Sequence, residues 1–66
     1  MKNKETVYVL IETDPDYIST TVYKDYDNAI SGLKEIAEEN DMEYHEGDSE
    51  AFSSDRYAEV RSETLN

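Results

Sequence analysis

The sequence contains no cysteine, so this chain has neither a disulfide nor a thiolate metal ligand. It also lacks any apolar run of about 18 residues, the minimum length for a membrane-spanning helix. The first four residues, Met-Lys-Asn-Lys, are charged, but no apolar stretch follows them as it would in a signal peptide. These absences predict a cytosolic protein that does not enter a membrane.

Positive charge is scarce as well. Lys and Arg number 6 against 17 Asp and Glu, which gives a formal net charge of -11. Small soluble domains usually carry a net charge of about 2 to 8 in magnitude. A field of this strength repels nucleic acid and anionic membranes and attracts basic surfaces, of which nucleic-acid-binding grooves are the largest class. We therefore expect a basic nucleic-acid-binding protein as partner, and no direct contact with nucleic acid.

The low mean hydropathy of -0.91 is typical of chains that stay unfolded. The apolar residues are nevertheless periodic, and six tyrosines supply large rings that a core can bury. We therefore predict one folded domain over residues 1–66. A chain of this length buries only about 60% of its unfolded surface, so its stability is expected to be marginal.

Local patterns predict two strands, a helix and a third strand. Residues 6–12 are β-branched and aromatic, residues 18–24 resume an alternating pattern, and the Pro15 turn between them is typical of a hairpin. A helix is predicted over residues 26–40, with Asp25 as its N-terminal cap and Asn40 near its end. Its apolar stripe consists of Tyr26, Ala29, Ile30, Leu33, Ile36 and Ala37.

Residues 41–55 show no period and are predicted to form an acidic loop, followed by a strand over residues 57–61 and a frayed tail over 62–66. Because each element has one apolar face to bury, the elements should form two layers. The predicted fold class is α+β, a three-stranded antiparallel sheet with one helix packed on one face, in the order ββαβ.

The sequence offers little for catalysis or metal binding. His45 is the only histidine, and no second histidine or suitably placed lysine accompanies a serine nucleophile. An EF-hand calcium loop needs an oxygen ligand at its fifth position and glycine at its sixth. A loop that starts at Asp25 has Ala29 and Ile30 at these positions, and a loop that starts at Asp14 does not match either. We therefore expect no enzyme activity, no metal site and no cofactor.

The strongest candidate site is a run of seven carboxylates in 13 residues, with no Lys or Arg among them. In extended chain, alternate residues lie about 6.6 Å apart, close to every second phosphate of a DNA strand at ~3.4 Å per phosphate. The run can therefore imitate a phosphate backbone, with Tyr44 as an aromatic anchor. The predicted partner-binding residues are Glu38, Glu39, Asp41, Glu43, Tyr44, Glu46, Asp48 and Glu50, with Asp14 and Asp16 of the hairpin turn, and Asp25 and Asp27 as a further extension.

Other interpretations stay open at this point. An acidic run is often only a solvated surface that aids solubility, as in a small housekeeping domain. The chain can also be an antitoxin-like or regulatory partner that neutralises one specific protein without mimicry. Self-association as a homodimer is equally open.

Residues 7–11, 21–23 and 25–30, read as VYVLI, TVY and DYDNAI, resemble small prokaryotic and phage proteins of ββαβ type. This resemblance includes no functional motif. In size, acidity and lack of cysteine, the chain is also similar to phage-encoded DNA-mimic inhibitors, including anti-restriction and anti-CRISPR proteins. That similarity implies a protein that occupies the nucleic-acid site of a host defence nuclease. It does not indicate which residues bind the nuclease, because those inhibitors share no motif.

Overall fold

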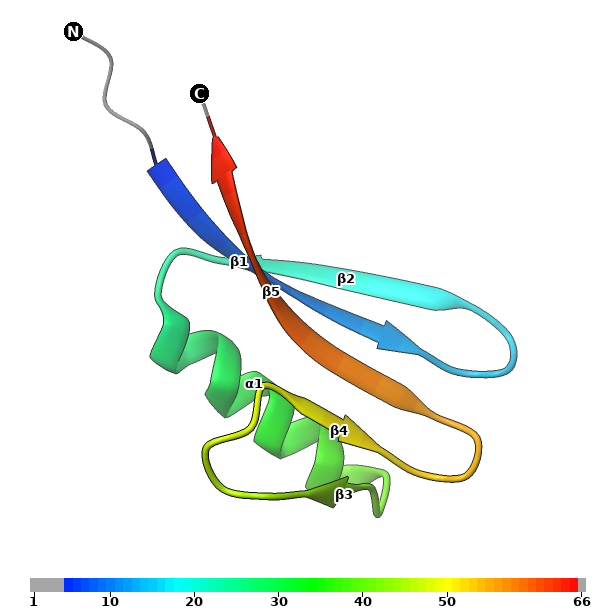
Figure 1. Ribbon diagram of the computed structural model, residues 1–66. Coiled ribbons are helices and arrows are strands. Elements are labelled where there is room, and N and C mark those ends of the chain that lie inside the picture. Colours follow the sequence, from blue (N-terminus) through cyan, green and yellow to red (C-terminus); the bar gives the residue numbers. More distant parts are fainter. Residues whose placement is uncertain (1–4, 66) are drawn as a thin grey trace, which may run out of the picture.

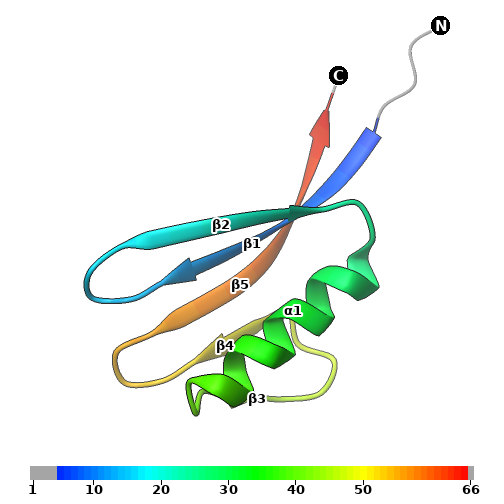
Figure 2. The same ribbon diagram turned by 180° about the vertical axis from the view of Figure 1, so that it is seen from behind.

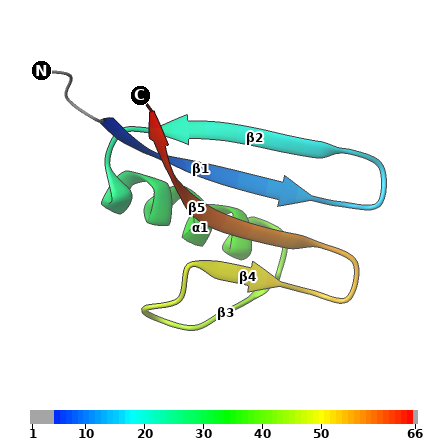
Figure 3. The ribbon, with the colours of Figure 1, turned by 45° about the horizontal axis from the view of Figure 1, so that its top comes forward.

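The computed structural model describes residues 5–65, which form one antiparallel sheet and one helix (Figure 1). The elements are β1 (Glu5–Thr13), β2 (Ile18–Tyr23), α1 (Tyr26–Glu39), β3 (Glu43–Tyr44), β4 (Glu50–Phe52) and β5 (Tyr57–Leu65). The strand order in the sheet is β2-β1-β5-β4-β3, so the last strand of the chain lies between β1 and β4 (Figure 3). Every neighbouring pair is antiparallel.

The predicted hairpin of β1 and β2 is confirmed, and its turn has a clear cause. The Asp14 carboxylate accepts hydrogen bonds from the backbone N–H groups of Asp16 and Tyr17, at 2.8 and 3.0 Å. The backbone N–H of Asp14 donates to the carbonyl oxygen of Tyr17 at 3.1 Å. A side chain that bonds the backbone two residues on, followed by proline, is a strong turn signal.

The predicted three-stranded sheet is wrong, because the sheet has five strands. Residues 41–55, expected to be a loop, contain β3 and β4, which have two and three residues. Strands this short are too brief to show an alternating pattern in the sequence. They form because Ala51 pairs with Tyr44 on one side and with Ala58 on the other, where it is fully buried.

The last strand is also longer than predicted. A frayed tail was expected after residue 61, whereas β5 continues to Leu65. Residues 62–65 pair with the first residues of β1, from Tyr8 back to Glu5. A pairing between the two ends of the chain cannot be inferred from local propensity, because neither end is strongly apolar.

The helix packs its predicted stripe against the sheet. Ala29 and Leu33 have no exposed surface, and Ala37 is 4% exposed. Leu10, Ala51, Ala58 and Val60 complete the core opposite them. Four alanines among these buried residues let the helix approach the sheet closely. At Gly32 the approach is closer still, since an added Cβ would lie 2.5 Å from the Tyr23 hydroxyl oxygen and 3.2 Å from a Leu10 methyl carbon.

The two ends of the helix differ from each other in how well the sequence predicted them. Asn40 lies at the C-terminal end as predicted, and both its backbone N–H and its side-chain amide donate to the Ile36 carbonyl oxygen, at 3.0 and 2.9 Å. Asp25 occupies the N-cap position, but its carboxylate makes no capping hydrogen bond and instead accepts one from the Asn28 amide at 3.4 Å. The predicted capping role of the Asp25 side chain is therefore wrong.

Only one face of the sheet is covered by α1 (Figure 2). Alternation along β1 turns Tyr8 and Leu10 toward the helix and Val7, Val9 and Ile11 toward the opposite side. We call that opposite side the uncovered face. It keeps apolar side chains in contact with solvent, as the exposed fractions of Ile18 (68%) and Val22 (62%) show.

Candidate acidic interface

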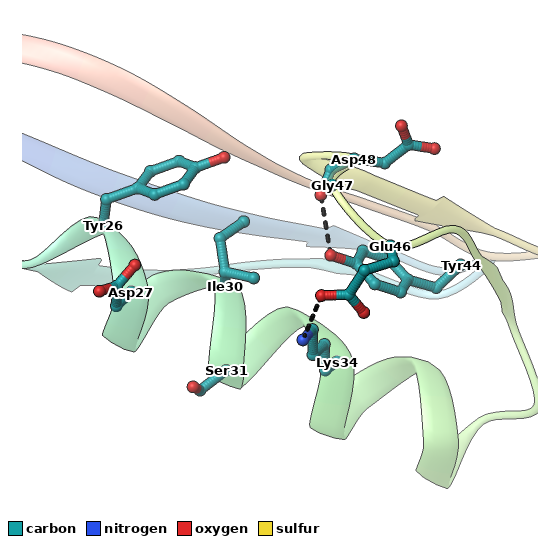
Figure 4. A pocket seen from close by; sticks show the side chains of 9 residues that line it. All are labelled: Tyr26, Asp27, Ile30, Ser31, Lys34, Tyr44, Glu46, Gly47 and Asp48. Carbon is teal, nitrogen blue, oxygen red and sulfur yellow. Dashed lines mark hydrogen bonds and ion pairs between the residues drawn. The ribbon is translucent and has the colours of Figure 1, made fainter.

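Two adjoining hollows lie between α1 and the segment that leads from β3 to β4. They share Lys34, Tyr44 and Glu46 in their walls. Figure 4 shows the first hollow, with Tyr44 and the loop over residues 46–48 opposite the helix. We call the two together the acidic groove, and the carboxylates that border it are Asp27, Glu38, Asp41, Glu46 and Asp48.

Three charged residues of this groove lie along one side of α1. Asp27, Lys34 and Glu38 stand at i, i+7 and i+11, so they share one side of α1. At 1.5 Å per residue, Asp27 and Glu38 are about 16 Å apart along the helix axis. A single DNA strand carries about five phosphates over that length. The separation of Asp27 and Glu38 along the helix therefore corresponds to about five phosphates.

Contacts with the helix and within the loop fix the far wall of the groove. Lys34 Nζ lies 3.1 Å from Glu46 Oε2, and the Tyr44 hydroxyl donates to the Asp48 carbonyl oxygen at 3.0 Å (Figure 4). The hydrogen bond to Glu46 raises the pKa of Lys34. Gly47, at φ 94°, allows the turn between these two anchor points, because this region of φ favours glycine.

The structure brings together half of the residues predicted from the sequence. Glu38, Asp41, Tyr44, Glu46 and Asp48 border the groove. Glu39 is exposed at the end of α1 but does not line either hollow. The carboxylates are not evenly spaced, because turns at residues 40–41 and 46–47 interrupt the extended chain on which the 6.6 Å spacing depended.

Glu43 and Glu50 lie on the other side of the molecule. Glu43 pairs with Phe52, and Glu50 pairs with Glu59, which places their side chains on the uncovered face. His45 Nε2 lies 2.8 Å from Glu43 Oε2, and this hydrogen bond raises the pKa of His45. The acidic run of the sequence is thus divided between the two faces of the sheet.

The two hairpin carboxylates have different surroundings. The Asp14 side chain is only 7% exposed, and Arg56 Nη1 lies 3.5 Å from its Oδ2. Since Asp14 also closes the turn, its role is structural and it is a poor partner contact. Asp16 is exposed in the turn itself and does not line the acidic groove.

Lys34 is the charged residue of the groove that sequence reasoning did not assign to the site. Its spacing predicts a pair with Glu38, four residues on, whereas its partner in the structure is Glu46, 12 residues away. No local signal could have indicated this contact, because it depends on where the β3–β4 loop returns to the helix.

Within residues 5–65, no three His, Cys, Asp or Glu side chains converge as metal ligands would, and no helix is long and apolar enough to cross a membrane. Comparison of the chain with protein-family models, with curated proteins and with solved structures gives no match.

A second arrangement of acids lies on the uncovered face. Glu50 and Glu59 stand directly opposite each other on β4 and β5, where like charges destabilise a sheet. The Tyr57 hydroxyl lies between them, 2.9 Å from Glu50 Oε1 and 3.0 Å from Glu59 Oε1. The hydrogen bond to Glu50, partial burial and the hydrogen bond to Glu59 raise the pKa of Tyr57 to about 12.

We expect Tyr57→Phe to lower the free energy of unfolding at neutral pH by about 1 kcal/mol, less than is usual for a hydrogen bond to a charged group because the site is partly exposed. The pKa is higher in the folded state than the ordinary 10.0, so this contribution is complete below pH 10 and is lost as the pH rises through about 12. Urea unfolding over this pH range should therefore give a flatter stability profile for Tyr57→Phe than for the unchanged chain. Tyr17→Phe, in the exposed turn, is the control, and identical profiles for Tyr57→Phe and the unchanged chain would contradict the bridging role.

Proposed function

We propose that this chain is an acidic inhibitor that binds the basic nucleic-acid groove of a host nuclease, or of another nucleic-acid-binding protein, by phosphate mimicry. It is then a cytosolic binding protein of anti-CRISPR or anti-restriction type, without catalytic activity. The observation that carries the proposal is the acidic groove, which five carboxylates border and in which Asp27 and Glu38 are about 16 Å apart along α1.

The availability of the carboxylates supports the proposal. All of the acidic residues except Glu12, Asp14 and Glu59 are exposed. Among residues 5–65, four carboxylates lie within 4.0 Å of a cationic or histidine side chain, and only one of these, Glu46, borders the groove. The other four groove carboxylates make no ion pair within residues 5–65, so a basic partner that binds them would displace solution cations, as it does when it binds nucleic acid.

One alternative has an observation in its favour. An acidic regulatory or antitoxin-like partner of one protein would bind through an apolar patch as well as through charge. The uncovered face supplies such a patch, with Ile18 and Val22 more than half exposed.

The two functions differ in their response to salt and to DNA. We expect the immobilised chain to capture proteins from a heparin-purified fraction of host lysate, and duplex DNA to displace them. The logarithm of the binding constant should fall linearly with the logarithm of the salt concentration, with a slope that reports several released counterions.

A polyanion of different shape provides the control for this experiment. Polyglutamate at equal charge concentration should displace the captured protein less effectively than duplex DNA does. Capture that duplex DNA leaves unchanged would contradict phosphate mimicry, and capture that persists at roughly 1 M salt, where the Debye length is about 3 Å, would favour the alternative.

A further inference from the structure

The uncovered face of the sheet combines an apolar stripe with an acidic border. The stripe runs across neighbouring strands and consists of Val7, Val9 and Ile11 of β1, Ile18 and Val22 of β2, Phe52 of β4 and Tyr57 of β5. Cross-strand pairing joins these residues in two groups, because Val9 stands opposite Val22 and Phe52 stands opposite Tyr57. Between the two groups, β5 places Glu63, Arg61 and Glu59 opposite the three apolar residues of β1. The acidic residues of this face, which form the border, are Glu5, Glu43, Glu50, Glu59 and Glu63, with Arg61 among them.

The stripe does not belong to the core beneath the helix. Val7 is 8% exposed, yet it is not part of the buried cluster around Leu33. Phe52, at 44% exposed, and Tyr57, at 38%, form a second apolar pair on β4 and β5. A strand that is apolar on both sides, as β1 is, normally lies between two layers. Within residues 5–65 only α1 supplies such a layer, and it lies on the other face (Figures 1 and 2).

The charges of this face indicate which kind of partner surface is complementary to it. Glu50 and Glu59 stand opposite each other and share one hydroxyl donor. Arg61 Nε lies 3.9 Å from Glu59 Oε2. Arg61 is the one cation that the described strands place on this face, against five carboxylates. Arginine or lysine side chains from outside would satisfy the remaining carboxylate oxygens.

A second copy of this chain is a poor occupant by the same reasoning. It would bring another net charge of -11 and another acidic border against the first. We propose that the uncovered face binds a partner protein whose surface presents aliphatic side chains rimmed by arginine and lysine. This surface is separate from the acidic groove, and the inference does not depend on phosphate mimicry.

The test uses two peptides of equal charge, one that alternates leucine with arginine and one that alternates serine with arginine. Isotope-labelled protein is titrated with each peptide, and the shifts of the backbone amide resonances are followed. We expect the leucine peptide to bind about tenfold more tightly than the serine peptide, a difference that reports apolar contact. Its shifts should centre on Val9, Ile11 and Val22.

The variant Ile18→Thr/Val22→Thr removes exposed apolar surface and keeps the β-branched shape. It should abolish the preference for the leucine peptide. The control Ser19→Ala/Thr21→Ala changes the same strand at positions that face the side of α1, and it should keep the preference. Thermal unfolding of both variants separates a loss of binding from a loss of folding.

Three results would overturn the inference. Equal affinity for both peptides would show that charge alone attracts them. Shifts confined to α1 and residues 44–48 would place the binding in the acidic groove. Concentration-dependent broadening at the uncovered face, with a dimer in sedimentation equilibrium, would show that a second copy covers it.

Discussion

Leu33→Ala is expected to leave much of the protein unfolded at physiological temperature. Leu33 is the largest side chain that is fully buried, and it lies at the centre of the cluster between α1 and the sheet. Truncating a buried leucine costs about 2 to 5 kcal/mol, through lost apolar burial and the cavity left behind. A 66-residue chain has a total stability of about 3 to 10 kcal/mol at 0.05 to 0.15 kcal/mol per residue. No disulfide is available to offset the loss.

Thermal and urea unfolding, followed by circular dichroism, would measure this effect. Glu35→Ala, at an exposed position of the same helix, is the matched control and should change stability little. Leu33→Met keeps most of the volume and should cost less than about 1.5 kcal/mol. If Leu33→Ala unfolded at the same temperature as the unchanged chain, the helix would not be packed on the sheet as described.

Glu38→Lys/Asp48→Lys should slow the association with a captured partner by about tenfold or more, because electrostatic steering raises association rates by about 10 to 10³. Both residues are exposed and border the acidic groove, and neither carboxylate has an ion pair among residues 5–65. The lysine at position 38 also lies near the C-terminal end of α1, where a cation is favourable, so folding should not suffer there. Stopped-flow or surface-based kinetics at several salt concentrations would measure the change.

Two further variants distinguish the effect of the groove carboxylates on the association rate from the effect of the total net charge. Glu5→Lys/Asp55→Lys alters the total charge equally, at exposed sites outside both hollows, and should slow association much less. Lys34→Gln removes the cation that pairs with Glu46 and should accelerate association. If the two double variants slowed binding equally, the effect would belong to the total charge and not to the groove.

The sequence predicted the secondary structure correctly wherever a single segment contained its own periodic pattern or turn motif. The β1–β2 hairpin has alternation and an Asp-Pro turn, and the helix stripe around Leu33 has a period of 3.6. Prediction failed where a strand exists only because of its neighbours. Ala51 is buried in β4 because β5 folds back beside it, and nothing in the three residues of β4 indicates a strand.

The candidate site shows the same division. The density of carboxylates over residues 38–50 could be seen in the sequence, and five of the ten predicted residues border the groove. The pairing of β3, β4 and β5 turned Glu43 and Glu50 to the opposite face. The contact between Lys34 and Glu46 joins residues 12 apart and followed from the return of a loop to the helix.

The sequence by itself determined the net charge, the absence of cysteine and the elements with a local period, because these properties are sums or repeats along the chain. Only the tertiary structure decided which carboxylates share a surface and that α1 covers only one of the two apolar sides of β1. Such properties depend on pairings between distant segments. The register between paired strands determines on which face of the sheet each side chain lies.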